Sequence, residues 1–473
     1  METVRSPIRF GTSGWRAIMA EDFTIENVRA VVRAIARYVK RRQEEATLIV
    51  GYDTRFLAET FARESARVLA EEGVDVLLCS EPVPTPVVAY AIVAERAQGG
   101  VNITASHNPP EYQGIKFSTA DGAPALPEVT REIEQEIERI RRAEGHQGSS
   151  GRRLGHIRAY DPREGYLRDL ARKVDVQTIE RARLRVAVDP LWGTARGYLD
   201  RFLREAGCDV HVLHDHRDVL FGGGAPEPSA ERLRTLREIV AAGGFDLGVA
   251  TDGDADRFGI VDRGGVFVTP NQILALLFDY LCETRSWEGG VARSVATSHQ
   301  VDRVARRRGR PVYETPVGFK YIGELLKAGK IILGGEESAG LSIRGHYPEK
   351  DGILAALLVV EIVARTGASV SEGLEHLYAQ DGRLWSERIE IALTEEGRQR
   401  LQQKLQADPP ADLFGRRLIE VNRADGLKLL FDDGSWLLLR LSGTEPVARC
   451  YAEATSEADL EVLLEQGRIF ALQ

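Results

Sequence analysis

The chain has 473 residues, of which 43% are hydrophobic and 28% charged, and its formal net charge is −9 at pH 7. This length and composition predict a globular protein large enough for three or four domains. Proteins that bind nucleic acids usually carry a net positive charge, and this chain does not, so we expect no nucleic acid partner. An anionic small molecule can still bind in a locally basic cleft.

The N-terminal part of the chain predicts a helix followed by a strand–helix–strand unit. Thr24 is a favourable N-cap residue. Apolar residues recur after it at helical spacing, at Ile25, Val28, Val32, Ile35 and Val39. Residues 48–53 are typical of a buried strand, a helix is expected to run through Ala70, and Gly73 separates it from a strand over 74–78.

The same unit recurs twice along the chain. A strand over 184–189, a helix through Arg204 and a strand starting at 208 repeat the pattern, and the segments EEGVDV and EAGCDV are nearly alike. A fainter copy begins with a strand over 294–297, continues with a basic helix and ends at 310–312. The recurrence predicts three related α/β units with mixed sheets.

Each unit continues with a third strand that ends in a polar loop. The strand over 101–103 precedes TASHNP, the strand over 247–250 precedes TDGDAD, and the strand over 331–333 precedes GGEES. Ligands of α/β sheets bind beyond the carboxyl ends of the strands. We therefore expect the three loops to converge on one cleft.

The remaining segments predict the domain boundaries. Residues 141–155, RRAEGHQGSSGRRLG, are rich in Gly, Ser and Arg and are typical of an exposed connection. After Ala368 the pattern changes to strands over 436–441 and 449–452 and a helix opened by a capping box at Ser456. We predict four domains, at residues 1–150, 151–265, 266–370 and 371–473, the last of them α+β.

Three carboxylates alternate along the TDGDADR loop, at Asp252, Asp254 and Asp256. All-oxygen ligands favour a hard cation such as Mg²⁺, and three acids so close together repel one another without one. A calcium EF-hand is the alternative, but Arg257 stands where its turn glycine belongs and Arg263 where its bidentate Glu belongs. We expect magnesium here rather than a solvated acidic turn.

The other motifs each allow a functional and an ordinary structural interpretation. In TASHNP, Ser106 can project from a sharp turn beside His107, yet such neighbours are common in turns. Lys116 is either an exposed lysine at a strand edge or a cation near a transferred phosphoryl group. GGEES supplies Glu336 and Ser338 for sugar hydroxyls, or is simply a polar loop.

The RLSGTEPVAR segment combines groups that a phosphate dianion requires, namely guanidinium groups, hydroxyls and backbone N–H groups in a glycine-containing turn. The residues concerned are Arg440, Ser442, Gly443, Thr444 and Arg449. The alternative is a hairpin turn with an exposed arginine on each side.

Five motifs occur in the order found in α-D-phosphohexomutases: FGTSGWR at 10–16, TASHNP, DGDADR, GEES and RLSGTEP. The sequence resembles this family over nearly its whole length, and each motif falls in the expected one of four domains. The resemblance implies a heart-shaped, four-domain enzyme that moves a phosphoryl group between the 1- and 6-positions of a hexose phosphate. It also implies Mg²⁺ as cofactor and glucose 1,6-bisphosphate as activator.

The resemblance further implies a role for individual residues. Mg²⁺ would bind three aspartates and one oxygen of a phosphoserine: Asp252, Asp254, Asp256 and Ser106. Three residues would surround the reacting hydroxyl in acid–base or charge-stabilising roles: Arg16, His107 and Lys116. The expected substrate-binding residues are Arg257, Gly318, Lys320, Glu336, Ser338, Lys350, Arg440, Ser442, Gly443, Thr444 and Arg449.

Two loops bear on the choice of hexose. The sugar loop continues as SAG at 338–340, where many mannose- and glucosamine-specific bacterial members have SGH. The segment TPVGFK at 315–320 resembles the TP-x-G-aromatic-Lys loop of phosphoglucomutases. We therefore expect glucose phosphate as substrate, with a phosphomannomutase or a dual glucose/mannose enzyme as the alternative.

Two other classes of protein are compatible with parts of the sequence. An aspartyl-nucleophile phosphatase also has a strand running into Asp-x-Asp, but Asp256 stands where that class has Thr or Val, and Ser106 would have no task. A non-catalytic sugar-phosphate sensor would have lost Ser106 or an aspartate ligand, and none is lost.

The four cysteines, Cys79, Cys208, Cys282 and Cys450, are widely separated and lack the spacing of a zinc site, so we expect reduced core thiols. No apolar run reaches the length of a membrane span, and METVRSPIRF lacks the apolar stretch of a signal peptide. We expect a cytoplasmic protein without a membrane partner, either a monomer or a small homo-oligomer.

Overall fold

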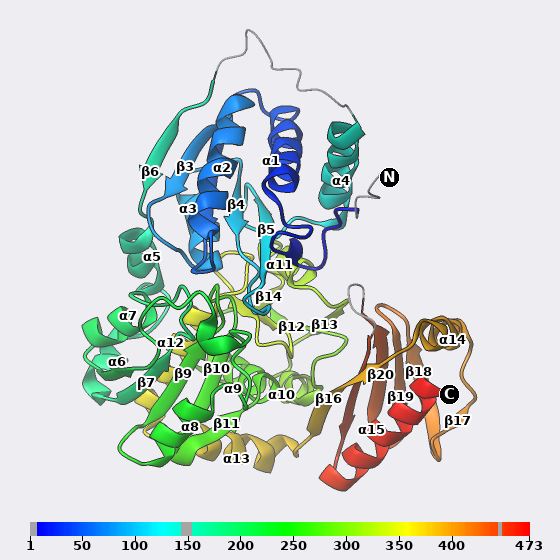
Figure 1. Ribbon diagram of the computed structural model, residues 1–473. Helices are drawn as coiled ribbons and strands as arrows, with labels where there is room; N and C mark the ends of the chain where they lie inside the picture. Colours follow the sequence, from blue (N-terminus) through cyan, green and yellow to red (C-terminus); the bar gives the residue numbers. More distant parts are fainter. Residues whose placement is uncertain (1–6, 143–153, 443–446) are drawn as a thin grey trace.

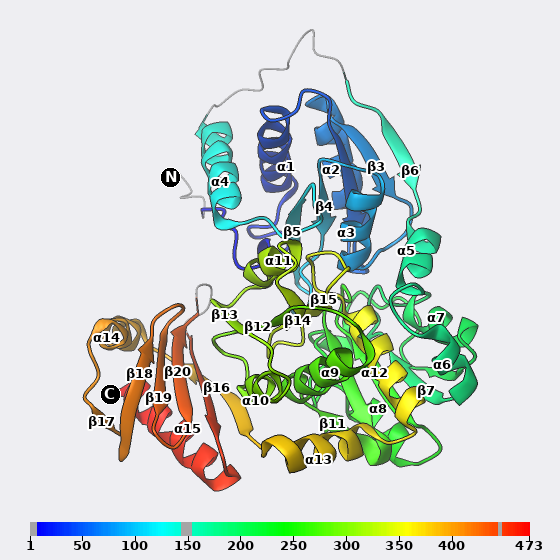
Figure 2. The ribbon, with the colours of Figure 1, turned by 180° about the vertical axis from the view of Figure 1, so that it is seen from behind.

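The computed structural model describes residues 7–142, 154–442 and 447–473. Figure 1 shows four units, three α/β units and a C-terminal unit beside the third, and Figure 2 shows the same arrangement from behind. The expected fold class is confirmed, since each unit has its own sheet. The predicted connection at 141–155 lies almost entirely outside the described residues, as do Gly443 and Thr444.

The first unit contains a six-stranded sheet in the order β1-β5-β4-β2-β3-β6. Its strands are β1 (Trp15–Ile18), β2 (Thr47–Tyr52), β3 (Asp75–Cys79), β4 (Gly99–Ile103), β5 (Tyr112–Thr119) and β6 (Ile157–Tyr160). Its helices are α1 (Ile25–Lys40), α2 (Ala58–Glu71), α3 (Thr85–Ala94) and α4 (Pro127–Arg142). Thr24 caps α1 as predicted, because its side chain accepts a hydrogen bond from the Asn27 N–H.

The second unit has a five-stranded sheet in the order β11-β10-β9-β7-β8. Its strands are β7 (Arg185–Asp189), β8 (Asp209–Val212), β9 (Leu247–Thr251), β10 (Phe258–Asp262) and β11 (Val266–Val268). The helices that precede or flank them are α5 (Arg163–Leu170), α6 (Val176–Ala182), α7 (Leu199–Glu205) and α8 (Arg234–Ala241).

The third unit has a four-stranded sheet in the order β13-β12-β14-β15. Its strands are β12 (Gly290–Ser294), β13 (Val312–Thr315), β14 (Ile331–Gly335) and β15 (Leu341–Ile343). Its helices are α9 (Pro270–Thr284), α10 (Gln300–Arg307), α11 (Phe319–Lys327), α12 (Gly352–Thr366) and α13 (Val370–Asp381).

These three units share one strand arrangement, which confirms the predicted repeat. The first strand of each repeat (β2, β7 or β12) lies between the second and third and runs parallel to both. A fourth strand then pairs antiparallel with the third. The TASHNP, TDGDAD and GGEES loops each connect the third strand to the fourth, so the topology gives them equivalent positions.

The fourth unit has an antiparallel sheet in the order β16-β21-β20-β19-β18-β17. The strands are β16 (Trp385–Ala392), β17 (Asp412–Leu413), β18 (Arg416–Asn422), β19 (Leu427–Phe431), β20 (Trp436–Leu441) and β21 (Val447–Ala454). The helices are α14 (Glu395–Gln406) and α15 (Glu457–Leu472), and Ser456 caps α15.

Some element boundaries differ from those expected. The predicted strand over 294–297 is wrong beyond its first residue, because β12 ends at Ser294 and Val295 packs with Trp436 of the fourth unit. Strand β6 pairs in parallel with β3, so the first sheet extends past the boundary predicted at residue 150. Helix α13 packs on α9 and α10, although it falls mostly beyond the boundary predicted at residue 370.

Helix α12 joins the second and third units through one hydrophobic core. Residues 353–360 along it are all fully buried, and it packs on α6, β9 and β10 of the second unit as well as on α9 and β15. Within the described part of the chain, no single helix is long and apolar enough to cross a membrane. Helices α12 and α13 pass that test only as a pair, which is bent by 82°.

The four cysteines are free thiols, as predicted, and all but Cys282 are buried. Burial raises the pKa of Cys79 and of Cys450 to about 12. These two thiols therefore stay protonated near neutral pH, which makes them poor nucleophiles.

Candidate active site

Ser106 lies in a buried turn between β4 and β5. Its φ is +53° and the residue is 1% exposed. This left-handed conformation costs a residue with a side chain about 1 kcal/mol, so neighbouring contacts must hold it. One such contact is the Ser106 N–H, which donates to Thr104 Oγ1 over 2.9 Å. The hydroxyl is thereby fixed at the carboxyl end of β4.

The three aspartates of the TDGDAD loop converge beside this hydroxyl. Asp252, Asp254 and Asp256 are each 1% exposed or less, and one oxygen from each lies within 4.8 Å of the others. Ser106 Oγ donates to Asp252 Oδ2 over 2.8 Å. The four residues expected to bind a metal are therefore brought together from two units.

The donor set fits a hard divalent cation. Asp254 Oδ1 and Asp256 Oδ1 are buried and have no hydrogen-bond partner among the residues that the structure describes. Burial, and then the charges of Asp254 and Asp256, raise the pKa of Asp252 well above its usual range. A divalent cation offsets this repulsion and accepts the unpartnered oxygens as ligands, so the three residues fit Mg²⁺.

Two lysines lie against the same carboxylates. Lys116 Nζ donates to Asp254 Oδ2 over 2.6 Å and to Asp256 Oδ2 over 2.7 Å, and Lys350 Nζ lies 3.1 Å from Asp256 Oδ2. Burial lowers the pKa of Lys116, but these two carboxylates raise it above its ordinary value, so the ammonium stays charged. Lys116 is 5% exposed, which excludes the interpretation as an exposed strand-edge lysine.

His107 and Arg16 surround the Ser106 turn. His107 Nδ1 lies 3.4 Å from Ser106 Oγ. Burial, and then the positive charges of Arg257 and Arg16, lower the pKa of His107 well below its ordinary value, so its ring is neutral. Arg16, in β1, donates from Nη1 to Asn108 Oδ1 over 2.6 Å. The turn is therefore lined by one neutral base and by permanent cations.

Arg257 follows the aspartates directly and retains an unused donor. Its backbone N–H donates to Asp252 Oδ1 over 3.1 Å, and its Nη1 donates to Glu227 Oε1 over 3.3 Å. Its Nε is buried and has no hydrogen-bond partner within the described residues. Such a donor is suited to an anionic ligand.

The GGEES loop of the third unit lies against the metal loop. The carbonyl of Ala339 accepts a hydrogen bond over 3.2 Å from the first residue of β10, and Ser338 precedes it in the same turn. Glu336 Oε1 accepts from the Gly318 N–H over 2.8 Å, and the φ of Gly318, +128°, is one that glycine tolerates best. Lys320 is buried without an ion pair among the described residues, and burial lowers its pKa.

Glu336→Gln is expected to stabilise the protein more at pH 8 than at pH 5. Burial, and then Glu337, raise the pKa of Glu336 to about 7, from 4.5 for the unperturbed group. The folded state therefore binds a proton on Glu336 more tightly than the unfolded state does. As a result, the free energy of unfolding of the wild type falls as the pH rises from 4.5 to about 7. Linkage gives a change of up to about 3 kcal/mol. Urea unfolding of both proteins at both pH values measures it, and a difference independent of pH would contradict the expectation.

The predicted phosphate-binding residues gather on the fourth unit. Arg440 and Arg449 are register partners across β20 and β21, and Ser442 follows β20. Arg440 Nη2 donates to Asp425 Oδ2 over 2.7 Å, and the same oxygen accepts from the Val317 N–H over 3.0 Å. These contacts connect Arg440 to the loop after β13, in the unit that carries Glu336, rather than to the Ser106 turn.

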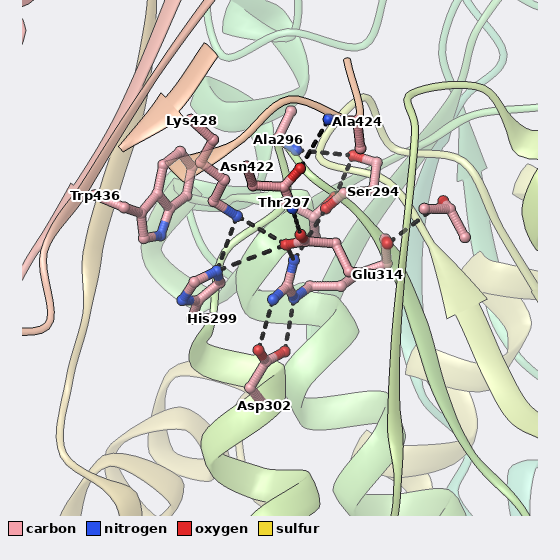
Figure 3. A network of polar contacts seen from close by, with 12 residues as sticks. Ser294, Ala296, Thr297, His299, Asp302, Glu314, Asn422, Ala424, Lys428 and Trp436 are labelled. Atoms are coloured by element: carbon pink, nitrogen blue, oxygen red, sulfur yellow. Dashed lines mark hydrogen bonds and ion pairs between the residues drawn. The ribbon is translucent and has the colours of Figure 1, made fainter. Parts of the chain in front are cut away.

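A partly buried polar network attaches the fourth unit to the third (Figure 3). Lys428 Nζ donates to Glu314 Oε2 over 2.9 Å and lies 2.9 Å from His299 Nε2. Asn422 Nδ2 also donates to Glu314. Lys428 is 1% exposed, and burial and then Arg293 lower its pKa to about 8. The network holds the sheet that carries the predicted phosphate site against the third unit.

Sequence reasoning missed several residues that contact the site. Thr85, at the start of α3, donates from its N–H to Asp254 O over 2.9 Å and from its hydroxyl to Asp254 Oδ2. Glu349 is buried beside Lys350, 3.2 Å from its Nζ. Arg55 is fully buried and donates to the carbonyl of Ser106. One signal for it was present, because Asp53 and Arg55 form a charged pair directly after a buried strand.

Comparison with known proteins agrees with this fold over nearly the whole chain. Residues 7–144, 164–265 and 269–380 match the family models described as "Phosphoglucomutase/phosphomannomutase, alpha/beta/alpha" domains I, II and III, and residues 390–468 match the C-terminal domain. A "Phosphoglucomutase/phosphomannomutase" of Thermococcus kodakarensis is 34% identical over 461 residues, 97% of each chain. A "Probable phosphoglucosamine mutase" of Methanothermobacter thermautotrophicus is 33% identical over 98% of each chain.

A solved structure has the same fold over nearly the whole chain. The crystal structure of a putative phosphomannomutase from Thermus thermophilus superposes with a TM-score of 0.85 at 34% identity, covering 98% of this chain and 99% of the other. The fold and these matches define an isomerase-class phosphotransferase. The chain belongs to the phosphoglucomutase/phosphomannomutase family, whose members are Mg²⁺-dependent phosphohexomutases.

Proposed function

We propose that this phosphohexomutase interconverts glucose 1-phosphate and glucose 6-phosphate through a phosphorylated Ser106 and a glucose 1,6-bisphosphate intermediate. One observation carries the proposal: the Ser106 hydroxyl lies 2.8 Å from Oδ2 of Asp252, one of three buried aspartates whose oxygens converge. A phosphoryl group on Oγ would place its oxygens beside the aspartate oxygens that could bind a metal ion. Glucose 1,6-bisphosphate would act as activator by phosphorylating Ser106.

Asp252, Asp254 and Asp256 would hold Mg²⁺ together with an oxygen of the phosphoserine. When bound, the ion supplies positive charge that stabilises the phosphoryl group during transfer. One oxygen from each aspartate lies within 4.8 Å of the others, which supports a shared cation site. Thr85 contributes by holding Asp254 through its N–H and its hydroxyl.

The protein side chains would handle charge and protons at Oγ. In transfer, the bond between phosphorus and Ser106 Oγ breaks while a bond to the sugar hydroxyl forms, the hydroxyl loses its proton, and a proton returns to Oγ. His107 Nδ1 lies 3.4 Å from Oγ, which places its ring within reach of the proton that returns there. Lys116 and Arg16 are cations, which suits stabilisation of charge on the transferred group. The unused Nε donor of Arg257 would contact the same phosphate.

The phosphate that does not react would bind the fourth unit. Arg440, Ser442 and Arg449 would grip it, together with Gly443 and Thr444, which lie outside the described residues. A site that accepts either phosphate of the bisphosphate explains how one catalytic centre serves both ends of the sugar. After the first transfer the intermediate turns over, and the other phosphoryl group returns to Ser106.

The sugar would bind between these two ends, and the sugar loop favours glucose over mannose or glucosamine. Glu336 and Ser338 offer acceptors and donors to hydroxyls, while Gly318, Lys320 and Lys350 complete the pocket. The Cβ of any larger residue at Gly340 would lie 2.1 Å from Lys350 Cδ, so this loop accommodates Lys350 closely. A phosphomannomutase or a dual enzyme is the alternative.

A coupled assay with glucose 1-phosphate, mannose 1-phosphate and glucosamine 1-phosphate tests the choice of substrate. Each reaction contains Mg²⁺ and a trace of the matching 1,6-bisphosphate. We expect the highest kcat/KM with glucose 1-phosphate. A higher value with mannose or glucosamine 1-phosphate would overturn the glucose assignment, and release of inorganic phosphate in place of the 6-phosphate would indicate a phosphatase.

Arg440→Ala is expected to lower kcat/KM for glucose 1-phosphate by about ten- to a hundredfold. The variant loses a charge-assisted contact to the held phosphate, which is worth about 1.5–3 kcal/mol. Both KM and kcat should change, because binding energy at the held phosphate positions the reacting end. Inorganic phosphate should also compete less well with substrate in the variant.

Arg416→Ala provides the control for this experiment. Arg416 lies in the same sheet and also forms an ion pair within the unit, with Asp433, but it is on β18, which β19 separates from β20. We expect its kcat/KM to stay within about twofold of wild type, as for a surface ion pair. If Arg440→Ala also stays within twofold, the turn after β20 is an ordinary hairpin.

A further inference from the structure

Arg55 is a fully buried arginine directly beneath the Ser106 turn, and none of the sequence motifs includes it. It follows β2 and forms an ion pair with Asp53, whose Oδ2 lies 3.1 Å from Arg55 Nε. A buried guanidinium group loses its hydration, so it persists only where carboxylate and carbonyl acceptors replace that water.

The guanidinium group of Arg55 uses all of its donors. Nη2 donates to the carbonyls of Ser106 over 2.7 Å and of Asn108 over 2.5 Å. Nη1 donates to the carbonyls of Pro109 over 2.7 Å and of Tyr112 over 3.1 Å. With the Nε bond to Asp53, every N–H of the group has an acceptor. Four carbonyls between residues 106 and 112 therefore accept hydrogen bonds from a single side chain.

These bonds hold the backbone carbonyl of Ser106, the residue that carries the Oγ hydroxyl. Ser106 has the left-handed φ of +53°, and its carbonyl is held by Arg55 on one side. On the other side the same carbonyl faces the metal loop, because a Cβ added to Gly253 would lie 2.8 Å from Ser106 O. The Ser106 carbonyl is thus enclosed between the Arg55 guanidinium group and the metal loop.

Arg55 is itself held from the second unit. Arg217 donates from Nη2 to the Arg55 carbonyl over 3.0 Å and from Nε to the Thr54 carbonyl over 3.1 Å. Arg217 also forms an ion pair with Glu59 over 2.9 Å. The segment beneath the Ser106 turn is thus connected to the unit that carries the aspartates.

We propose that Arg55 is a positioning residue for phosphoryl transfer, which sets the Ser106 hydroxyl at the distance and angle that the aspartate cluster requires. It acts through the backbone of the Ser106 turn and does not touch the substrate. The expected fall in kcat rests on the proposed function. The expected loosening of the Ser106 turn does not depend on the proposed function.

Arg55→Lys tests this role, because lysine keeps the charge but has three donors on one atom instead of five on a rigid fork. We expect kcat to fall about a hundredfold, the scale of loss for a misplacement of about 1 Å. KM for glucose 1-phosphate should stay within about threefold, because the sugar and distal phosphate sites are untouched. Amide hydrogen exchange should rise across residues 104–112.

Arg285→Lys is the matched control. Arg285 forms an ion pair over 2.6 Å with Glu361, a fully buried carboxylate in the third unit. Replacement of Arg285 by lysine therefore also disturbs the contact of an arginine with a buried carboxylate. We expect its kcat to stay within about twofold of wild type and its exchange over 104–112 to be unchanged, since it is remote from the turn. If Arg55→Lys does not fold, Asp53→Asn replaces it, because that variant keeps the guanidinium group and removes its carboxylate anchor.

The results separate this inference from the proposed function. Unchanged hydrogen exchange over 104–112, a kcat within twofold of wild type, or an equal fall of kcat in Arg285→Lys would overturn the positioning role. If the wild type itself interconverts none of the three hexose phosphates, the proposed function fails, and hydrogen exchange alone then decides whether Arg55 holds the turn.

Discussion

Ser106→Ala is expected to abolish mutase turnover while the protein remains folded. The variant loses the oxygen that carries the phosphoryl group, and the loss of a covalent carrier costs at least about a thousandfold in kcat. Stability should change little, because alanine pays a similar cost for the left-handed turn and Arg55 still holds its carbonyl. The coupled assay with glucose 1-phosphate and urea unfolding measure the two effects.

Ser65→Ala is a suitable control for Ser106→Ala. Ser65 is a fully buried serine of α2 in the same unit, and its Oγ has no hydrogen-bond partner among the described residues. Its removal should leave turnover near that of wild type. Near-normal turnover in Ser106→Ala would mean that another group carries the phosphoryl, and the role assigned to the TASHNP loop would have to be withdrawn.

Asp254→Asn is expected to reduce kcat by about a hundred- to a thousandfold and to raise the Mg²⁺ concentration needed for half-maximal activity. The variant loses negative charge where the cation would bind. It also deprives Lys116 of one of its two carboxylate partners, which lies 2.6 Å from Nζ. KM for glucose 1-phosphate should change only a few-fold, because the sugar-binding loops are separate. Titration of activity with Mg²⁺ checks the expectation.

Asp262→Asn distinguishes loss of a metal ligand from loss of a buried carboxylate. Asp262 is 1% exposed at the end of β10, where its oxygens accept from the N–H groups of Val370 and Ser371. Its replacement should lower the free energy of unfolding without altering the Mg²⁺ requirement. An unchanged Mg²⁺ requirement in Asp254→Asn would mean that the aspartate triplet is a structural turn.

The convergence of the three loops could be predicted because it follows from the repeat. Each unit places its third strand beside its first, and the loop that follows therefore emerges at the same sheet edge. Residues within the loops, such as Ser106 and the three aspartates, could be identified from their motifs. The direction in which each loop's side chains point was implied only by the family resemblance.

The supporting residues could not be predicted because their partners are distant in sequence. Arg55 binds carbonyls more than fifty positions away, from 106 to 112, and carbonyls leave no pattern in a sequence. Thr85 contacts Asp254 across two units. Val295 and Ala296 form an apolar run typical of a strand, but they are buried against the fourth unit instead, which hydrophobicity alone does not distinguish.

Transfer of label from ³²P-glucose 1,6-bisphosphate to dephosphorylated protein tests the phosphoserine mechanism most directly. In the presence of Mg²⁺, we expect one phosphoryl group per chain, located by peptide mapping on the segment that contains Ser106, with release of an equal amount of glucose monophosphate. Unlabelled glucose 1-phosphate added afterwards should remove the label from the protein and recover it in the sugar. Label on a peptide that lacks Ser106, or its loss as inorganic phosphate rather than to the sugar, would contradict a phosphoserine mutase.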